Sequence, residues 1–92
     1  MAIGPAAGRL TLMPRFLLIH HHEPNECACA WAAWNGHISP LRGLEVSCTC
    51  LHGRHRVWWE VDAPDSDAAL ALLPGYVACR TRALPVRRVV TP

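Results

Sequence analysis

The sequence predicts an α+β fold in a single domain, with four strands and two helices in the order βαββαβ. Three observations lead to this prediction. The chain has 92 residues, which is too short for two independent hydrophobic cores. Hydrophobic residues make up 51% of the sequence and charged residues 17%, which excludes a disordered or low-complexity chain. Short apolar segments with strand character alternate with segments rich in alanine.

The first half of the chain predicts a strand followed by a helix. Residues 14–22 (PRFLLIHHH) form a short apolar run after a proline, which is typical of a buried strand. Residues 26–35 (ECACAWAAWN) are rich in alanine and lack β-branched side chains, which favours a helix. Asn25 can cap this helix and Gly36 can end it.

The second half predicts a hairpin, a short helix and a last strand. Residues 45–51 (EVSCTCL) and 54–62 (RHRVWWEVD) alternate in polarity around a His-Gly turn, so they read as two paired strands. Residues 64–67 (PDSD) are typical of a helix start and precede AALALL. Residues 76–83 indicate an irregular segment or a helical turn, and residues 85–90 (PVRRVV) a final strand.

This order of elements is that of a ferredoxin-like fold, a four-stranded antiparallel sheet with both helices on one face and strand order 4-1-3-2. The first strand carries apolar side chains on both faces, with Leu17 and Ile19 on one and Phe16 and Leu18 on the other. An apolar face without helices needs a partner to cover it. We therefore expect a homodimer.

The first residues of the chain bear on two questions, the start of the folded domain and the cellular location. Residues 1–12 mix Gly, Pro and Ala, and we expect a flexible extension before a single domain of residues 13–92. Residues 1–12 lack the apolar stretch of a secretory signal, and no apolar run approaches the length of a membrane span, so we expect a cytoplasmic protein without membrane contact. In a reducing compartment the five cysteines are expected as thiols or metal ligands.

The charge pattern argues against a nucleic-acid partner. The chain has nine basic residues, all of them arginine, and a net charge of +2. These arginines are scattered along the sequence and form no dense basic stripe.

A metal site is predicted where the first strand ends. The run of three histidines ends five positions before Cys27, and imidazole and thiolate ligands together suit zinc, nickel or copper. Strand alternation places His20 and His22 on the same face, and the helix start favours the Cys27 thiolate. We expect the beginning of the second strand near this end of the sheet, which adds Cys48, whereas Cys50 is expected to lie further away.

A purely structural interpretation stays open for these residues. The histidines can solvate the end of the strand, and free cysteines often pack as small apolar side chains. Trp58 and Trp59 are neighbours on a predicted strand and so face opposite sides of the sheet. One is expected beneath the helices, and the other on the second face, at a dimer interface or a pocket.

The chain resembles the dimeric α/β-barrel superfamily of small ferredoxin-like proteins. The resemblance rests on RFLLIHHH (15–22), WWEVDAPDSDAALALL (58–73) and PVRRVV (85–90), and it covers about residues 13–91. It looks most like small actinobacterial-type members, some of which bind nickel. The resemblance implies a dimer and, in the enzymes of the superfamily, a pocket between helices and sheet.

Three functions remain open at this point. The leading hypothesis is a small cytoplasmic transition-metal-binding protein that buffers or senses the metal through His20, His22, Cys27 and Cys48. The resemblance also allows a cofactor-independent enzyme of the monooxygenase type, with a histidine as acid or base and a tryptophan as pocket wall. A structural or accessory subunit without a ligand is the third possibility.

Overall fold

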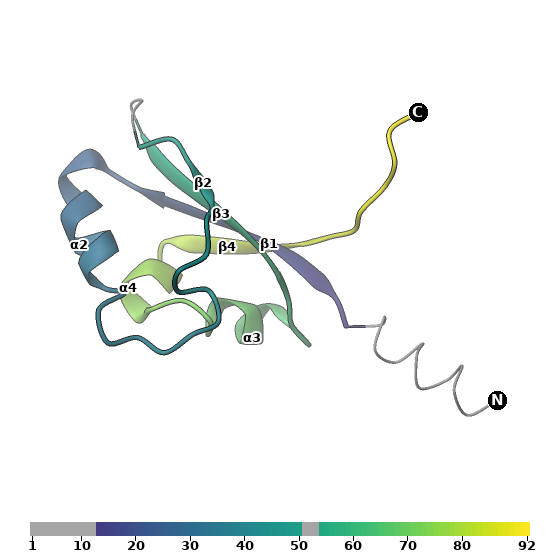
Figure 1. Ribbon diagram of the computed structural model, residues 1–92, viewed down its shortest axis with the longest axis horizontal. Helices are drawn as coiled ribbons and strands as arrows, with labels where there is room; N and C mark the ends of the chain where they lie inside the picture. Colours follow the sequence, from purple (N-terminus) through teal and green to yellow (C-terminus); the bar gives the residue numbers. More distant parts are fainter. Residues whose placement is uncertain (1–12, 51–53) are drawn as a thin grey trace.

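The computed structural model describes residues 13–50 and 54–92 and shows an α+β fold with a four-stranded antiparallel sheet. The strands are β1 (Arg15–His22), β2 (Ser47–Cys48), β3 (His55–Asp62) and β4 (Thr81–Val86). The helical segments are η1 (Pro24–Glu26), α2 (Cys27–Ala32), α3 (Ser66–Leu70) and α4 (Gly75–Ala78) (Figure 1). The predicted extension of residues 1–12 and the predicted His-Gly turn lie outside the described residues.

The sheet has the order β2-β3-β1-β4, and every pair of neighbours is antiparallel. Strands β1 and β2 are both antiparallel to β3, so they run in the same direction. The ends of β1 and β2 and the beginning of β3 therefore lie at one end of the sheet. The register confirms this placement, because His22, the last residue of β1, lies opposite His55, the first residue of β3.

The helices cover one face of the sheet, and the hydrophobic core lies between them (Figure 1). Alternate residues of β1 and β3 are buried, as the period of two in a strand requires. From the helical side, Ala69, Leu73 and Val77 pack against this face. The core strand residues are Phe16, Leu18, Val57, Trp59 and Val61.

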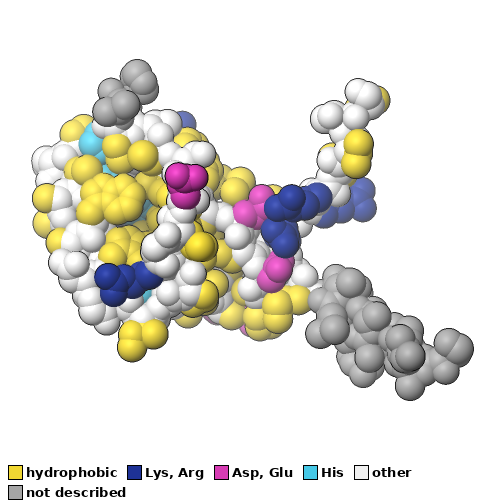
Figure 2. All heavy atoms as spheres, viewed as in Figure 1, with side chains coloured by type: hydrophobic (Ala, Val, Ile, Leu, Met, Phe, Trp, Pro, Cys, Tyr) yellow, Lys and Arg dark blue, Asp and Glu magenta, His cyan; other side chains and the backbone are white. Residues whose placement is uncertain are grey.

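The other face of the sheet, which we call the open face, carries Leu17, Ile19 and Trp58, all half-buried. At one end of this face Arg15 forms ion pairs with Glu60 and Asp62, which lie on the neighbouring strand. Figure 2 shows these opposite charges gathered where the C-terminal segment leaves the sheet. The open face thus differs from the helix-covered face both in its residue composition and in its burial.

The last strand differs from its predicted position of residues 85–90. It begins at Thr81 and ends at Val86, which lies opposite Arg15. Because β1 begins at Arg15, residues after Val86 have no neighbouring strand to pair with. Val90 is accordingly 96% exposed in spite of its strand propensity.

The second strand is also shorter than the predicted range of 45–51. Among the described residues, β2 comprises Ser47 and Cys48, and the Thr49 backbone N–H also donates to the Arg56 carbonyl at 2.9 Å. The segment before them forms a loop whose Leu41 is buried in the core, so tertiary packing replaces strand pairing there.

The helix predicted over 26–35 is split and shorter. A turn of 3-10 helix precedes α2, and Glu23 rather than Asn25 occupies the cap position. The Glu23 backbone N–H donates to the Glu26 carboxylate at 2.9 Å. In α3, by contrast, the predicted helix start is confirmed, because Asp65 Oδ1 accepts from the Ala68 backbone N–H at 2.7 Å. Within the described ranges, no helix has the length and apolar character that crossing a bilayer requires.

Two neighbouring leucines of β1 test which face forms the core. Leu18 is 0% exposed, so Leu18→Ala is expected to lower the free energy of unfolding by about 2–5 kcal/mol. Leu17→Ala removes the same atoms from the half-covered open face and is expected to cost about 1 kcal/mol. Urea denaturation of both variants measures the difference, and equal losses would contradict this assignment of faces.

Candidate metal centre

Two chain reversals bring two histidines and two cysteines together at one end of the sheet. The first reversal joins β1 to α2 and separates His22 from Cys27 by four residues. The second joins β2 to β3 and separates Cys50 from His55, also by four residues. Each reversal therefore contributes one imidazole and one thiol, at a spacing within the usual range for paired zinc ligands.

The potential ligand atoms of these four residues all lie within 4.8 Å of one another. His22 Nε2 and His55 Nδ1 are 3.2 Å apart. Two nitrogen ligands of a tetrahedral zinc ion, each about 2.0–2.1 Å from the metal, are separated by about 3.4 Å. The group could therefore hold a metal ion, which would replace the hydrogen bond between the two imidazoles.

The sheet register explains why these residues meet. His22 and His55 are direct cross-strand partners, on the face that the helices cover. Cys48 lies opposite Val57 in the neighbouring pair of strands. Two residues further along this register, Cys50 comes level with His55. Cys27 completes the group from the first turn of α2, which follows β1 after only a short turn.

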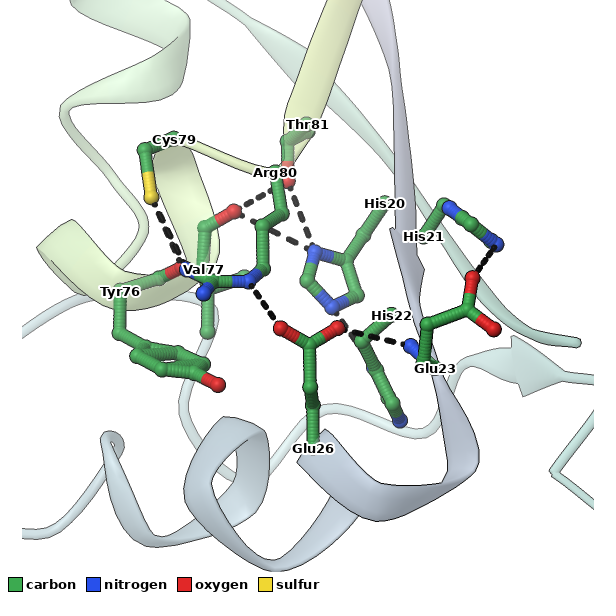
Figure 3. A network of polar contacts seen from close by, with 10 residues as sticks. All are labelled: His20, His21, His22, Glu23, Glu26, Tyr76, Val77, Cys79, Arg80 and Thr81. Carbon is green, nitrogen blue, oxygen red and sulfur yellow. Dashed lines mark hydrogen bonds and ion pairs between the residues drawn. The ribbon is translucent and has the colours of Figure 1, made fainter.

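A chain of hydrogen bonds behind the group fixes the orientation of His22 (Figure 3). The carbonyl of Val77 can only accept, so His20 Nδ1, at 3.3 Å from it, carries a proton. His20 Nε2 then accepts from His22 Nδ1 at 2.8 Å. The Thr81 hydroxyl donates to the same Val77 carbonyl at 2.7 Å and lies 3.1 Å from His20 Nδ1. His22 Nε2 therefore carries a lone pair, which accepts from His55 Nδ1 at 3.2 Å when no metal is bound.

The electrostatics keep both buried histidines neutral. His20 and His22 are each 1% exposed. Burial, together with the nearby His22, lowers the pKa of His20 from 6.5 to about 4. Burial and the neighbouring His55 also lower the pKa of His22. Neutral imidazole is the form that binds a metal ion, so the environment prepares His22 as a ligand.

The thiols have the opposite tendency when no cation is present. Burial raises the pKa of Cys50 to about 11, and the neighbouring Cys48 and Cys27 thiols add to this effect. Several thiols that close together cannot all ionise without a compensating positive charge. A divalent cation would supply that charge, and its binding would release the thiol protons.

An ion pair secures the segment that carries Cys27 (Figure 3). Arg80 Nε donates to Glu26 Oε2 at 3.1 Å, and the guanidinium lies 3.7 Å above the Tyr76 ring. Arg80 also donates to the Tyr76 carbonyl at 3.0 Å. Glu26 directly precedes Cys27, so these contacts tie the start of α2 to the junction of α4 and β4.

The structure brings together only part of the predicted ligand set. His22 and Cys27 belong to the group, whereas His20 lies behind His22 and Cys48 is exposed beside it. Cys50 and His55 take their places. The prediction placed the wrong end of the second strand beside His22. Because β2 runs parallel to β1, its end rather than its beginning lies beside His22.

A sequence signal for the two missed residues does exist. Cys50 and His55 flank the predicted hairpin turn with the same four-residue spacing that separates His22 from Cys27. Two such pairs, each across a chain reversal, are a stronger pattern than the histidine run alone.

Trp58 and Trp59 lie on opposite faces of the sheet, as strand alternation predicts. Trp59 is buried beneath the helical side and packs against Trp34 with ring centroids 5.7 Å apart. Trp58 lines a hollow on the open face. Trp31 is less covered than a core position would be, since it is 41% exposed and meets the edge of the His22 ring at 6.4 Å.

A shallow groove of about 200 Å³ lies beside the centre, between Trp31, Trp34 and the loop that carries Leu41 and Val46. Figure 2 shows hydrophobic side chains gathered at this end of the molecule. The remaining two cysteines, Cys29 and Cys79, are exposed and outside the group.

Comparisons of the chain with protein-family models, with curated proteins and with solved structures found no match. The interpretation of the centre therefore rests on its own geometry.

The buried His20 predicts a pH dependence of the metal-free protein. Its folded-state pKa is below the ordinary value, so the unfolded chain binds the proton first as the pH falls. Stability is complete above pH 6.5 and is lost as the pH approaches 4. We expect His20 to account for a loss of about 2–3 kcal/mol between pH 7 and 4.5.

Urea unfolding with a chelator present measures this loss. His20→Asn can still donate to Val77 but does not titrate, so the variant should lack that part of the pH dependence. An identical pH dependence in the variant would contradict the assignment.

Proposed function

We propose that this protein binds a transition-metal ion, with Zn²⁺ as the best fit, through His22, Cys27, Cys50 and His55. The observation that carries the proposal is the convergence of four ligand atoms within 4.8 Å. Two thiolates and two imidazoles in a compact arrangement suit tetrahedral zinc. The hydrogen bond from His22 to His20 adds the outer-sphere support that metal-binding histidines usually have.

Four protein ligands would complete the coordination of zinc and leave no position for a substrate. This supports a role in holding the metal, as in buffering or sensing, rather than in metal catalysis. His22 is buried, whereas Cys27, Cys50 and His55 are half-buried, so the ion can reach the site from one side.

The wider assignment is part of the same proposal. The order β2-β3-β1-β4, read from the opposite edge, is 4-1-3-2 with antiparallel neighbours, which supports a ferredoxin-like arrangement. Membership of the dimeric α/β-barrel superfamily stays a prediction from the resemblance alone.

The enzymatic alternative has less support from the geometry. Both ring nitrogens of His20 are engaged within the protein. The hollow lined by His20, His22 and Trp59 leaves no room for a molecule as large as water. A histidine acid–base pair would need space for its substrate next to it.

Metal analysis of the untagged protein, purified without chelator, tests the proposal. We expect one zinc per chain and a tetrahedral absorption spectrum after replacement of zinc by cobalt. Zinc at a thousandfold excess over its dissociation constant should stabilise the fold by about 4 kcal/mol.

Single substitutions distinguish the ligand set seen in the structure from the set predicted from the sequence. Cys50→Ser and His55→Ala should each abolish most of the zinc-dependent rise in melting temperature, because each removes one of four ligands. Cys48→Ser and Cys79→Ser also replace a sulfur atom by oxygen, but outside the group. These two variants should keep the zinc-dependent rise in melting temperature. If the Cys50→Ser and wild-type proteins show the same shift with zinc, nickel and copper, the metal-binding proposal fails.

The hydrogen-bond chain behind His22 yields a separate prediction. His20→Phe fills the same space but cannot accept from His22 Nδ1, so the tautomer of His22 is no longer fixed. Zinc affinity is expected to fall about 10–100-fold, the usual effect of losing such a partner. Competition with a chromogenic chelator measures it, and unchanged affinity would show that His20 serves only packing.

A further inference from the structure

The fold gathers arginines that are scattered in the sequence. Arg54 and Arg56 precede Trp58 at two-residue intervals, and Arg82 lies on β4. The register aligns Trp58, Ile19 and Arg82 in one row across the sheet. All of these residues line a single hollow of about 530 Å³ on the open face, which is within the usual range for ligand sites.

These three arginines lack internal acidic partners. All seven acidic residues lie in the described part of the chain, and the ion pairs found there involve none of Arg54, Arg56 and Arg82. Arg80, at the rim, is engaged with Glu26. His21, which also lines the hollow, has its Nε2 3.4 Å from Glu23 Oε2. The hollow thus carries an uncompensated positive charge.

A second copy of the chain does not complement this charge. The carboxylates of the open face are Glu60 and Asp62, at its other end. Both are already paired with Arg15, and Glu60 also with Arg88. A face-to-face dimer would therefore place the arginines against a surface whose charges are already balanced.

A polyanion with planar groups complements both features of the hollow. Arginine binds phosphate with its planar array of donors, and an indole ring offers a surface on which a base can stack. Trp58 is half-buried within the pleated sheet, so an unpaired base can reach it, whereas a base held in a duplex cannot. The arginines on β3 and β4 are separated by β1, about 10 Å across the sheet, which suits a chain of phosphates better than a single one.

We propose that the open face binds single-stranded nucleic acid, with a base stacked on Trp58 and phosphates on Arg54, Arg56 and Arg82. This activity is separate from metal binding, since the metal centre lies on the opposite face of the sheet. Up to twenty-seven residues separate these arginines in the sequence, so the basic surface exists only in the folded chain.

Fluorescence anisotropy with a labelled twelve-nucleotide oligothymidylate tests the proposal on the full-length, zinc-treated protein. Three phosphate contacts predict a slope of about −2 for log affinity against log salt concentration. Trp58→Ala should weaken binding at least about fivefold, because it removes the stacking surface. Trp58→Phe should restore most of this loss, and it also controls for the fold.

A second comparison tests the contribution of the arginine charges to binding. The double variant Arg56→Gln and Arg82→Gln should weaken binding and reduce the salt slope by about 1.4. Arg42→Gln removes a charge from the loop on the helical side and should bind as the wild type does.

Three results would overturn the proposal. One is equal binding by the Trp58→Ala variant and the wild type. Another is displacement by inorganic polyphosphate or by duplex DNA as effective as that by the unlabelled single strand. The third is a dimer in light scattering that Trp58→Ala dissociates, together with no binding of the oligonucleotide, which would assign the face to self-association.

Discussion

The antiparallel pairing of β1 with β3 is the interaction on which the other features depend. Its register places Leu18 opposite Trp59 and His22 opposite His55. The first pair lies in the hydrophobic core and the second in the metal centre, so one row of alternating residues serves both. A shift by one residue would turn all of these side chains to the other face. The core thus holds the metal ligands in position through the same hydrogen-bonded ladder.

The direction of β2 decides the composition of the centre. Because β2 and β1 run in parallel on either side of β3, three chain segments meet at one end of the sheet. The α2 start joins them, secured by the ion pair between Glu26 and Arg80. Two local turns therefore supply metal ligands that are far apart in the sequence. Each turn is short, so it limits the distance between the two ligands on either side of it. A bound ion would join these turns and so stabilise the fold.

The two faces of the sheet have different physical roles. On the helical side, buried histidines stay neutral because desolvation disfavours their charged form. On the open face, Arg54, Arg56 and Arg82 are exposed to water and have no acidic partner among the described residues. The alternation of a single strand separates them, since Arg56 and Val57 are neighbours in sequence but face opposite ways. The chain can therefore keep a neutral ligand site and a basic surface on opposite faces of the same sheet.

The sequence by itself determined the α+β class, the helix start at Asp65 and the two long strands, predicted over 14–22 and 54–62 and each within one residue of its observed bounds. It also indicated a His/Cys cluster that includes His22 and Cys27. These are local features, because strand alternation, helix capping and short-range spacing act between residues that are close in the chain. Only the tertiary structure decided that Cys50 and His55 join the cluster while His20 supports it from behind, and that β4 ends at Val86. Both outcomes depend on which residues of neighbouring strands lie opposite one another. The local pattern of one strand does not define this register, so packing and backbone hydrogen bonding between distant segments had to select it.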